Sequence, residues 1–130
     1  SGVANLDYVV YQASQRNLKL ILVLTNNWSD FGGINAYLDA YNGTYHDDFF
    51  REEAIKSAYK NWVSYLLNRK NVYNNLQYKD DPTVFGWELI NEIRCRNSGE
   101  YPVSSSCNIA LTTSWVSEMC NHLKSIDSNH

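Results

Sequence analysis

The sequence predicts an α/β fold in which helices alternate with two parallel strands. Two short apolar runs, residues 18–24 and 83–92, have the length and composition of strands that are buried on both faces. Segments with apolar residues at helical spacing precede, separate and follow them, so the order is helix, strand, helix, strand, helix. Strands that alternate with helices in this way lie parallel and are joined by right-handed crossovers.

Helical periodicity defines three elements, over residues 5–15, over residues 52–68 and in a last segment after residue 111. Each has apolar residues at intervals of three and four, which predicts that one face of the helix packs against the sheet. These residues are Leu6, Val9, Val10 and Ala13; then Ile55, Tyr59, Trp62, Val63 and Leu66; then Trp115, Val116, Met119, Leu123 and Ile126.

Long loops are expected where the strands end, over residues 25–48 and 93–111. Each is roughly twenty residues long where a handful is usual, whereas the turn into the first strand is short. Long loops at the carboxyl ends of parallel strands mark the functional edge of a sheet, and Glu92 lies at that edge. Because two strands alone would leave apolar edges unpaired, we expect residues 1–130 to be the central part of one larger domain, incomplete at both ends.

Composition excludes several classes of protein. The formal net charge of −3 and the absence of a basic patch argue against nucleic acid as a partner. No apolar run approaches the ~20 residues that span a bilayer, and no signal peptide is recognisable, so any targeting segment lies outside the chain. Neither the cysteines nor the histidines have the spacing of a zinc site, and no cofactor is expected. The 14% aromatic content fits either a tyrosine-rich core or a surface that receives sugar rings.

Three cysteines allow at most one internal disulfide and leave one thiol over. Cys95 and Cys107 flank the second long loop and could form a disulfide across it. Cys120 lies on the last helix, where a buried thiol is favoured over a pairing outside the chain. Glycosylation sequons begin at Asn27 and Asn42, and together with the cysteines they indicate a secreted protein.

Two glutamates in the second strand, Glu88 and Glu92, suggest chemistry. Strict alternation places both on one face and turns Phe85, Trp87 and Leu89 toward the helices. The two carboxylates would stand roughly 13 Å apart. Retaining glycosidases need about 5–5.5 Å and inverting ones about 6.5–9.5 Å, so the two glutamates are not catalytic partners. Glu88, the deeper one, is expected to be a structural acid bridged to a basic group. Glu92, at the mouth, is the catalytic candidate, with a surface or salt-bridge role as the alternative.

The stretch GWELINEIRC, residues 86–95, resembles the fourth-strand signature of glycoside hydrolase family 5, whose members are retaining β-glycosidases. With the loop NNWSDFGG, residues 26–33, it is most similar to the plant and fungal endo-β-1,4-mannanases of that family. The resemblance covers nearly the whole chain. It implies a fragment of a (β/α)8 TIM barrel, from about helix 2 to helix 4, and retaining endo-hydrolysis of β-1,4-mannosidic bonds in mannan, galactomannan or glucomannan.

The resemblance also implies site residues. Glu92 matches the general acid/base, Asn91 the residue that binds the sugar 2-hydroxyl, and Arg94 an arginine on the leaving-group side. Trp28 resembles an aromatic wall of the cleft, although a ring packed under its own loop is the alternative. Asn27, at the same strand end, is expected to line the cleft, which leaves Asn42 as the better glycosylation site.

Two features qualify the resemblance. Ile93 stands where family members usually have proline, which makes the placement of Arg94 less secure. The family's nucleophile is a glutamate on strand seven, with no counterpart in residues 1–130, so the isolated chain is expected to be inactive. The full-length protein is expected to be a secreted monomer whose partner is β-mannan polysaccharide.

Three other functions fit parts of the pattern. The first is another β-glycanase, either an endoglucanase or a β-mannosidase, and the second is a non-catalytic carbohydrate-binding barrel. The third, an open doubly wound sheet that binds a nucleotide, would need a glycine-rich turn directly after a strand, and none is present.

Overall fold

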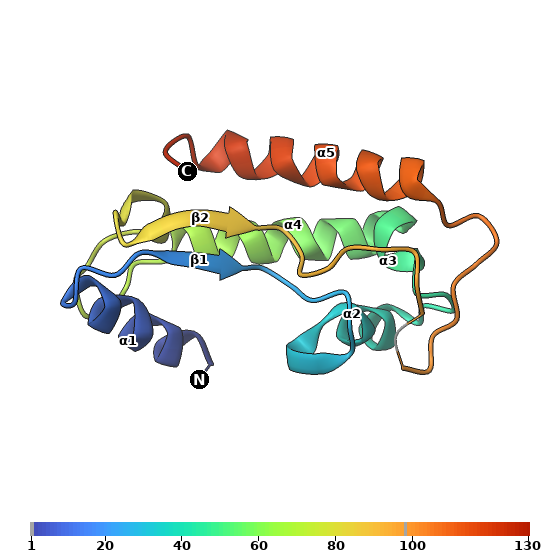
Figure 1. Cartoon of the computed structure of the whole chain (residues 1–130), viewed down its shortest axis with the longest axis horizontal. Coiled ribbons are helices and arrows are strands. Elements are labelled where there is room, and N and C mark those ends of the chain that lie inside the picture. Colours follow the sequence, from blue (N-terminus) through green and yellow to red (C-terminus); the bar gives the residue numbers. More distant parts are fainter. Residues whose placement is uncertain (1, 98) are drawn as a thin grey trace.

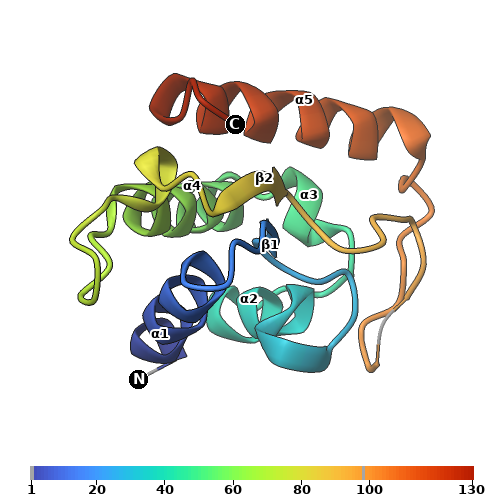
Figure 2. The same ribbon diagram turned by 60° about the vertical axis from the view of Figure 1, so that its left-hand side comes forward.

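A computed structural model describes residues 2–97 and 99–130 of the chain. Two parallel strands lie in the middle, with one helix behind them and other helices above and below (Figures 1 and 2). In chain order the elements are α1 (Gly2–Ser14), β1 (Leu20–Val23), η1 (Asp30–Gly32), α2 (Ile34–Tyr41), α3 (Asp48–Arg51), α4 (Glu53–Asn68), η2 (Tyr78–Asp80), β2 (Val84–Glu88) and α5 (Ile109–Ile126).

The strands form a parallel pair, as the alternation of strands and helices predicts. Leu22 pairs with Trp87 and Val23 with Glu88. Helix α4, in the crossover, is tied to both strand ends. The Trp62 indole donates to the carbonyl of Leu24 at 3.0 Å, and the Tyr59 hydroxyl donates to that of Leu89 at 2.7 Å. One helix therefore holds the carboxyl ends of both strands in place relative to each other.

Buried aromatic rings fill the space between α3, α4 and α5. Trp115 lies 5.1 Å from Tyr59 and 5.4 Å from Phe49, measured between ring centroids. The predicted stripes of α4 and α5 are largely confirmed, because their buried residues include Ile55, Tyr59, Val63, Leu66, Trp115, Met119 and Leu123. In α1, Val10 and Ala13 are buried as expected, but Val9 is 51% exposed. Tyrosine thus serves the core at Tyr59 and Tyr78, although other tyrosines are exposed.

The expected alternation along the second strand is wrong at its start. Leu20 pairs with Val84 but Ile21 pairs with Gly86, so Phe85 has no partner across the pair. The register shift reverses the faces at this point: Val84 is buried, and Phe85 is 70% exposed instead of packing under the helices. Trp87 does face the helices, where its indole donates to Asp127 at the end of α5 at 2.7 Å.

The expected loop over residues 25–48 contains helices. α2 forms where Ile34 and Leu38 point inward, and it ends at Asn42 in the left-handed conformation. Gly43 then donates its amide hydrogen back to the carbonyl of Leu38 at 2.8 Å, which closes the helix end. The short helix α3 follows and contributes Phe49 and Phe50 to the core.

Two further expectations need correction. Cys120 is free and exposed, not buried, because it lies beside the buried stripe of α5 rather than in it. Glu88 is half-buried, and no basic side chain forms an ion pair with it among residues 2–97 and 99–130.

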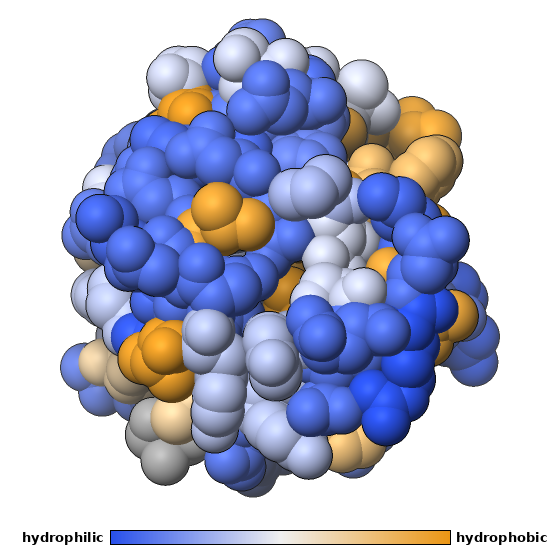
Figure 3. All heavy atoms as spheres, turned by 90° about the vertical axis from the view of Figure 1, so that its left-hand side faces the viewer, coloured by the Kyte–Doolittle hydropathy of each residue, from blue (hydrophilic) through white to orange (hydrophobic). Residues whose placement is uncertain are grey.

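The two ends of the strand pair differ in character. The face at the amino ends of the strands carries mainly hydrophilic side chains, with small scattered hydrophobic groups (Figure 3). The long connections lie at the opposite, carboxyl end (Figure 1). Within the described part of the chain, the helices are too short or too polar to cross a membrane.

Candidate active site

The backbone pairing continues beyond the two strands and builds the site. Leu24 donates its amide hydrogen to the carbonyl of Glu88, Asn91 to that of Thr25 and Asn27 to that of Asn91, at 2.9–3.1 Å. These bonds place the segment after β1 beside the segment after β2. Residues that lie more than sixty positions apart in the sequence therefore meet at one edge.

Glu92 lies in a turn and not in the strand, since β2 ends at Glu88. Its φ of 54° is in the left-handed region, which is uncommon for a residue with a side chain and persists where the surrounding structure holds it. The Glu92 side chain is 51% exposed, so its carboxylate is open to solvent. Because Glu92 lies outside β2, the alternation of side chains along the strand does not set the direction of its carboxylate.

Trp28 and Glu92 are in direct contact. The indole Nε1–H of Trp28 donates to Glu92 Oε2 at 2.6 Å. The ring is only partly buried. Its indole hydrogen bond points to the site carboxylate and not into its own loop.

Arg94 completes a group of three side chains. Its guanidinium carbon lies 5.4 Å from the centroid of the Trp28 ring, within the range of a cation–π contact. Its Nε donates to the carbonyl of Glu92 at 3.1 Å, and its Nη2 lies 3.8 Å from Glu92 Oε2. With Ile93 between Glu92 and Arg94, the guanidinium still lies beside Trp28 and Glu92.

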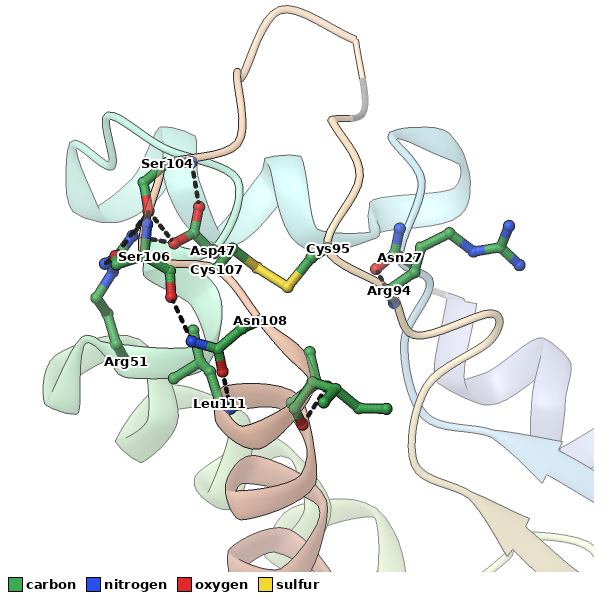
Figure 4. The surroundings of a disulfide bond; sticks show 12 residues. Asn27, Asp47, Arg51, Arg94, Cys95, Ser104, Ser106, Cys107, Asn108 and Leu111 are labelled. Carbon is green, nitrogen blue, oxygen red and sulfur yellow. Dashed lines mark hydrogen bonds and ion pairs between the residues drawn. A yellow bond between two sulfur atoms is a disulfide. The ribbon is translucent and has the colours of Figure 1, made fainter.

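Asn91 and Asn27 occupy different environments. The Asn91 amide is half-buried and donates to Asn26 Oδ1 at 3.0 Å. Asn27 is fully buried, and its Oδ1 accepts the amide hydrogen of Arg94 at 3.2 Å (Figure 4). Its side chain thus lies beneath the surface instead of lining it as expected from the sequence.

The loop after Glu92 is held by a disulfide and an ionic cluster. Cys95 and Cys107 are bonded, as their positions at the ends of the loop allowed. Asp47 accepts hydrogen bonds from the Ser104 amide at 2.8 Å and hydroxyl at 2.6 Å, and it pairs with Arg51 (Figure 4). Burial alone would raise the pKa of Asp47, but the Ser104 bonds and the Arg51 charge outweigh it and lower the pKa. The ionised Asp47 therefore anchors the loop to α3.

Sequence reasoning did not single out several residues that shape this edge, namely Asn26, Gly33, His46 and Asp47. Asn26 and Gly33 lie in the loop NNWSDFGG that carries the resemblance, but neither was assigned a role of its own, and His46 and Asp47 belong to no recognisable catalytic pattern. For Gly33 there was also a turn signal, because it is part of a Gly-Gly pair in a long loop.

Gly33 permits the close approach that positions Trp28. A Cβ atom at residue 33 would lie 1.9 Å from the Trp28 carbonyl oxygen and 2.6 Å from that of Asn26. We expect Gly33→Ala to lower the melting temperature by several degrees and to weaken substrate binding, since the backbone at Trp28 must move. Gly2→Ala is the control, because a Cβ there meets nothing within 4 Å. Equal melting curves and equal KM values for the two variants would contradict this role.

A cavity of about 730 Å³ lies next to the site, between the end of β1, α2 and α4. Its lining is mainly apolar and includes Phe31, Tyr37 and Trp62, with Asn26 and Asn91 at one side. Glu92, Trp28 and Arg94 do not line it, so we assign the polar chemistry to the edge and not to this cavity.

The fold and the site together define a class of protein. A half-exposed carboxylate at the carboxyl edge of parallel strands, bound to an indole and flanked by a guanidinium, is an arrangement suited to acid–base chemistry on a sugar in a β/α-barrel glycosidase. The family model described as GH family 5 beta-mannosidase-like matches residues 2–130. The chain belongs to this family of glycoside hydrolases.

Characterised relatives and solved structures agree with the assignment. Mannan endo-1,4-beta-mannosidase 1 of Arabidopsis thaliana is 46% identical over 125 residues, which cover 96% of this chain and 28% of that protein. The endo-1,4-beta-mannanase structure from Rhizomucor miehei superposes with a TM-score of 0.94 at 47% identity, over 96% of this chain and 35% of that one. The endo-1,4-beta-D-mannanase structure from Thermotoga petrophila superposes with a TM-score of 0.90 at 44% identity, over 100% of this chain and 34% of that one.

These solved mannanases are (β/α)8 barrels, so the two strands and their helices form part of such a barrel. The chain spans about a third of the length of the relatives that it matches.

Proposed function

We propose that the full-length protein is a retaining endo-β-1,4-mannanase in which Glu92 is the general acid/base. The observation that carries this proposal is the 2.6 Å hydrogen bond from Trp28 to Glu92 at the carboxyl edge of the strands. It supports a carboxylate held in one orientation beside an aromatic ring on which a sugar can stack. The mannanases among the relatives support β-mannan as the substrate class.

The chemistry follows from a carboxyl group that can exchange one proton. In the first step, protonated Glu92 donates its proton to the glycosidic oxygen as the sugar–oxygen bond breaks, and a second carboxylate bonds to the sugar carbon. In the second step, ionised Glu92 takes a proton from water, whose oxygen displaces that carboxylate. Trp28 binds Oε2, which leaves Oε1 for proton transfer. The second carboxylate comes from a strand outside residues 1–130, which we place in the central part of the catalytic domain.

The neighbouring residues bind the polymer. Asn91 donates one amide hydrogen to Asn26, which leaves its amide oxygen and its second amide hydrogen to bind the 2-hydroxyl of the sugar. Arg94, over the Trp28 ring, contacts sugar on the leaving-group side, and Trp28 forms a wall of the cleft. Asn27, being fully buried, supports the site from below.

Hydrolysis assays on defined polymers test the proposal. The full-length protein should cleave mannan, galactomannan or glucomannan internally, with the β-anomer as the first product, and should leave cellulose largely intact. Preferential cleavage of cellulose would indicate an endoglucanase, and release of single mannose units would indicate a β-mannosidase. Binding to mannan without any cleavage would support a non-catalytic carbohydrate-binding barrel.

The isolated chain of residues 1–130 should not hydrolyse galactomannan. A general acid without an opposing carboxylate nucleophile cannot form the glycosyl-enzyme, so the rate should equal that of buffer. Reducing-end release measured at high chain concentration checks this. Turnover that depends on Glu92 would contradict the two-carboxylate account.

The protein is secreted and works as a monomer on extracellular or cell-wall mannan. The Cys95–Cys107 disulfide supports an oxidising compartment. Asn42 is exposed at the end of α2 and is the better glycan acceptor, whereas Asn27 is fully buried and therefore closed to a glycosyltransferase in the folded state.

A further inference from the structure

Asn27 holds the backbone on both sides of Glu92. The backbone N–H of Asn27 donates a hydrogen bond to the carbonyl of Asn91, the residue before Glu92, at 3.1 Å. Its side-chain oxygen accepts the amide hydrogen of Arg94, two residues after Glu92, at 3.2 Å. A turn with a left-handed φ at Glu92 is intrinsically unfavourable, so external bonds at its two ends are what keep it in place.

His46 in turn holds Asn27. Its Nε2 lies 3.0 Å from the Asn27 carbonyl oxygen, and since a carbonyl only accepts, Nε2 must carry the hydrogen. The His46 backbone donates to the carbonyl of Pro102 at 2.9 Å, which ties it to the loop that follows Arg94. The ring is fully buried and packs edge-on against Phe50.

The chemistry at His46 is unusual for a residue that serves packing alone. In the described part of the chain, His46 Nδ1 and Asn27 Nδ2 are both buried without a hydrogen-bond partner. A buried polar atom that lacks a partner is unfavourable, and an apolar side chain at position 46 would avoid this. What the imidazole supplies that an apolar side chain cannot is the Nε2–H donor to Asn27.

We propose that His46 and Asn27 are positioning residues that set the orientation of Glu92 for proton transfer. The inference rests on the proposed role of Glu92 as general acid/base. Neither residue touches the substrate. The buried imidazole fixes the Asn27 backbone, Asn27 fixes the two ends of the turn, and the turn presents the carboxylate to the glycosidic oxygen and to Trp28.

Two substitutions of His46 by amide residues in the full-length protein distinguish the effect of the Nε2–H donor from the effect of the imidazole ring. Gln at position 46 reaches with its amide nitrogen to about the place of Nε2 and can still donate to Asn27. Asn is one methylene shorter, reaches only to the place of Nδ1 and loses that bond. His46→Gln is therefore the matched control for His46→Asn, and both leave Glu92 and Trp28 unchanged.

The readout is the dependence of the rate on the leaving group. When a mannooligosaccharide is cleaved, the leaving oxygen needs a proton. When a dinitrophenyl β-mannobioside is cleaved, the leaving group departs as the stable dinitrophenolate anion and needs no proton. We expect His46→Asn to lower kcat/KM for the oligosaccharide about 10- to 100-fold, as a misplaced catalytic group does, and for the aryl substrate less than about 3-fold. His46→Gln should stay within about 3-fold of the parent on both substrates.

The outcomes are distinct. Equal losses on both substrates for His46→Asn would mean a general structural role and would overturn the inference. If His46→Asn does not fold, then His46→Gln decides: a folded His46→Gln with parental rates supports the donor role, and a selective loss on the oligosaccharide contradicts it. A parent protein that cleaves neither substrate would refute the proposed function and the inference with it.

Discussion

Replacing Glu92 with glutamine should lower kcat/KM for mannan by about 10²- to 10⁴-fold, the usual contribution of a general acid/base. The amide oxygen of glutamine can still accept the Trp28 indole hydrogen, so the side chain should keep its place while it loses the ability to transfer a proton. KM on mannan should change little, because the sugar-binding groups remain. Initial rates of reducing-end release by the purified full-length protein measure the effect.

The control for this variant is Glu53→Gln, which makes the same chemical change on α4, where the Glu53 side chain is 79% exposed. It should keep parental activity. A Glu92→Gln protein that retains more than about a tenth of the parental rate would remove Glu92 from the mechanism.

Replacing Asp7 with asparagine should destabilise the full-length protein by about 3 kcal/mol, the low end of the range for breaking a buried ion pair. Asp7 is fully buried in α1 and accepts bonds from Arg69 at 2.7 and 3.1 Å and from the Tyr78 hydroxyl at 2.8 Å. The change leaves the Arg69 charge without its counter-charge. Denaturant unfolding at pH 7 measures the loss, and Glu53→Gln, at a side chain that is 79% exposed, should lose less than about 1 kcal/mol.

The same variant should show a specific pH dependence. Burial alone would raise the pKa of Asp7, but the bonds from Arg69 and Tyr78 and the Arg69 charge outweigh it and lower the pKa. A carboxyl group with a lowered folded-state pKa stabilises the fold above its unfolded value of about 3.9, and this stabilisation is lost as the pH falls through the folded-state pKa. The difference between parent and variant should be constant from neutral pH down to about 5 and shrink below about 4. A difference that grows on acidification would contradict the ion pair.

The fold was predictable where the period of the apolar residues and the length of the segment indicate the same type of secondary structure. The long stripes of α4 and α5 and the apolar run at β1 left few alternatives, and their alternation fixed the parallel pairing. α2 was missed because eight residues with only two deeply buried apolar side chains follow a Gly-Gly pair and resemble a loop. What stabilises α2 is tertiary contact at Ile34 and Leu38, which the local pattern does not reveal.

The site was predictable as a set of residue types but not in its geometry. The sequence indicated that Trp28, Glu92 and Arg94 belong together, and the structure brings them into contact. It could not indicate that Phe85 falls at a register shift or that Glu92 lies in a left-handed turn, since both depend on pairing with a distant segment. Asn27 was expected to line the cleft because it lies at the same strand end as Trp28, and its contacts with Asn91, Arg94 and His46 instead hold it in the interior.

Chemical rescue of Glu92→Ala by azide tests the central claim most directly. With an activated aryl β-mannobioside, the full-length variant should form the glycosyl-enzyme normally and stall, because no group is left to deprotonate water. Azide needs no general base and fits the space left by the carboxylate, so added azide should restore turnover and yield the β-mannobiosyl azide. An α-configured azide would identify Glu92 as the nucleophile instead, and no response to azide would show that Glu92 takes no part in the proton transfers.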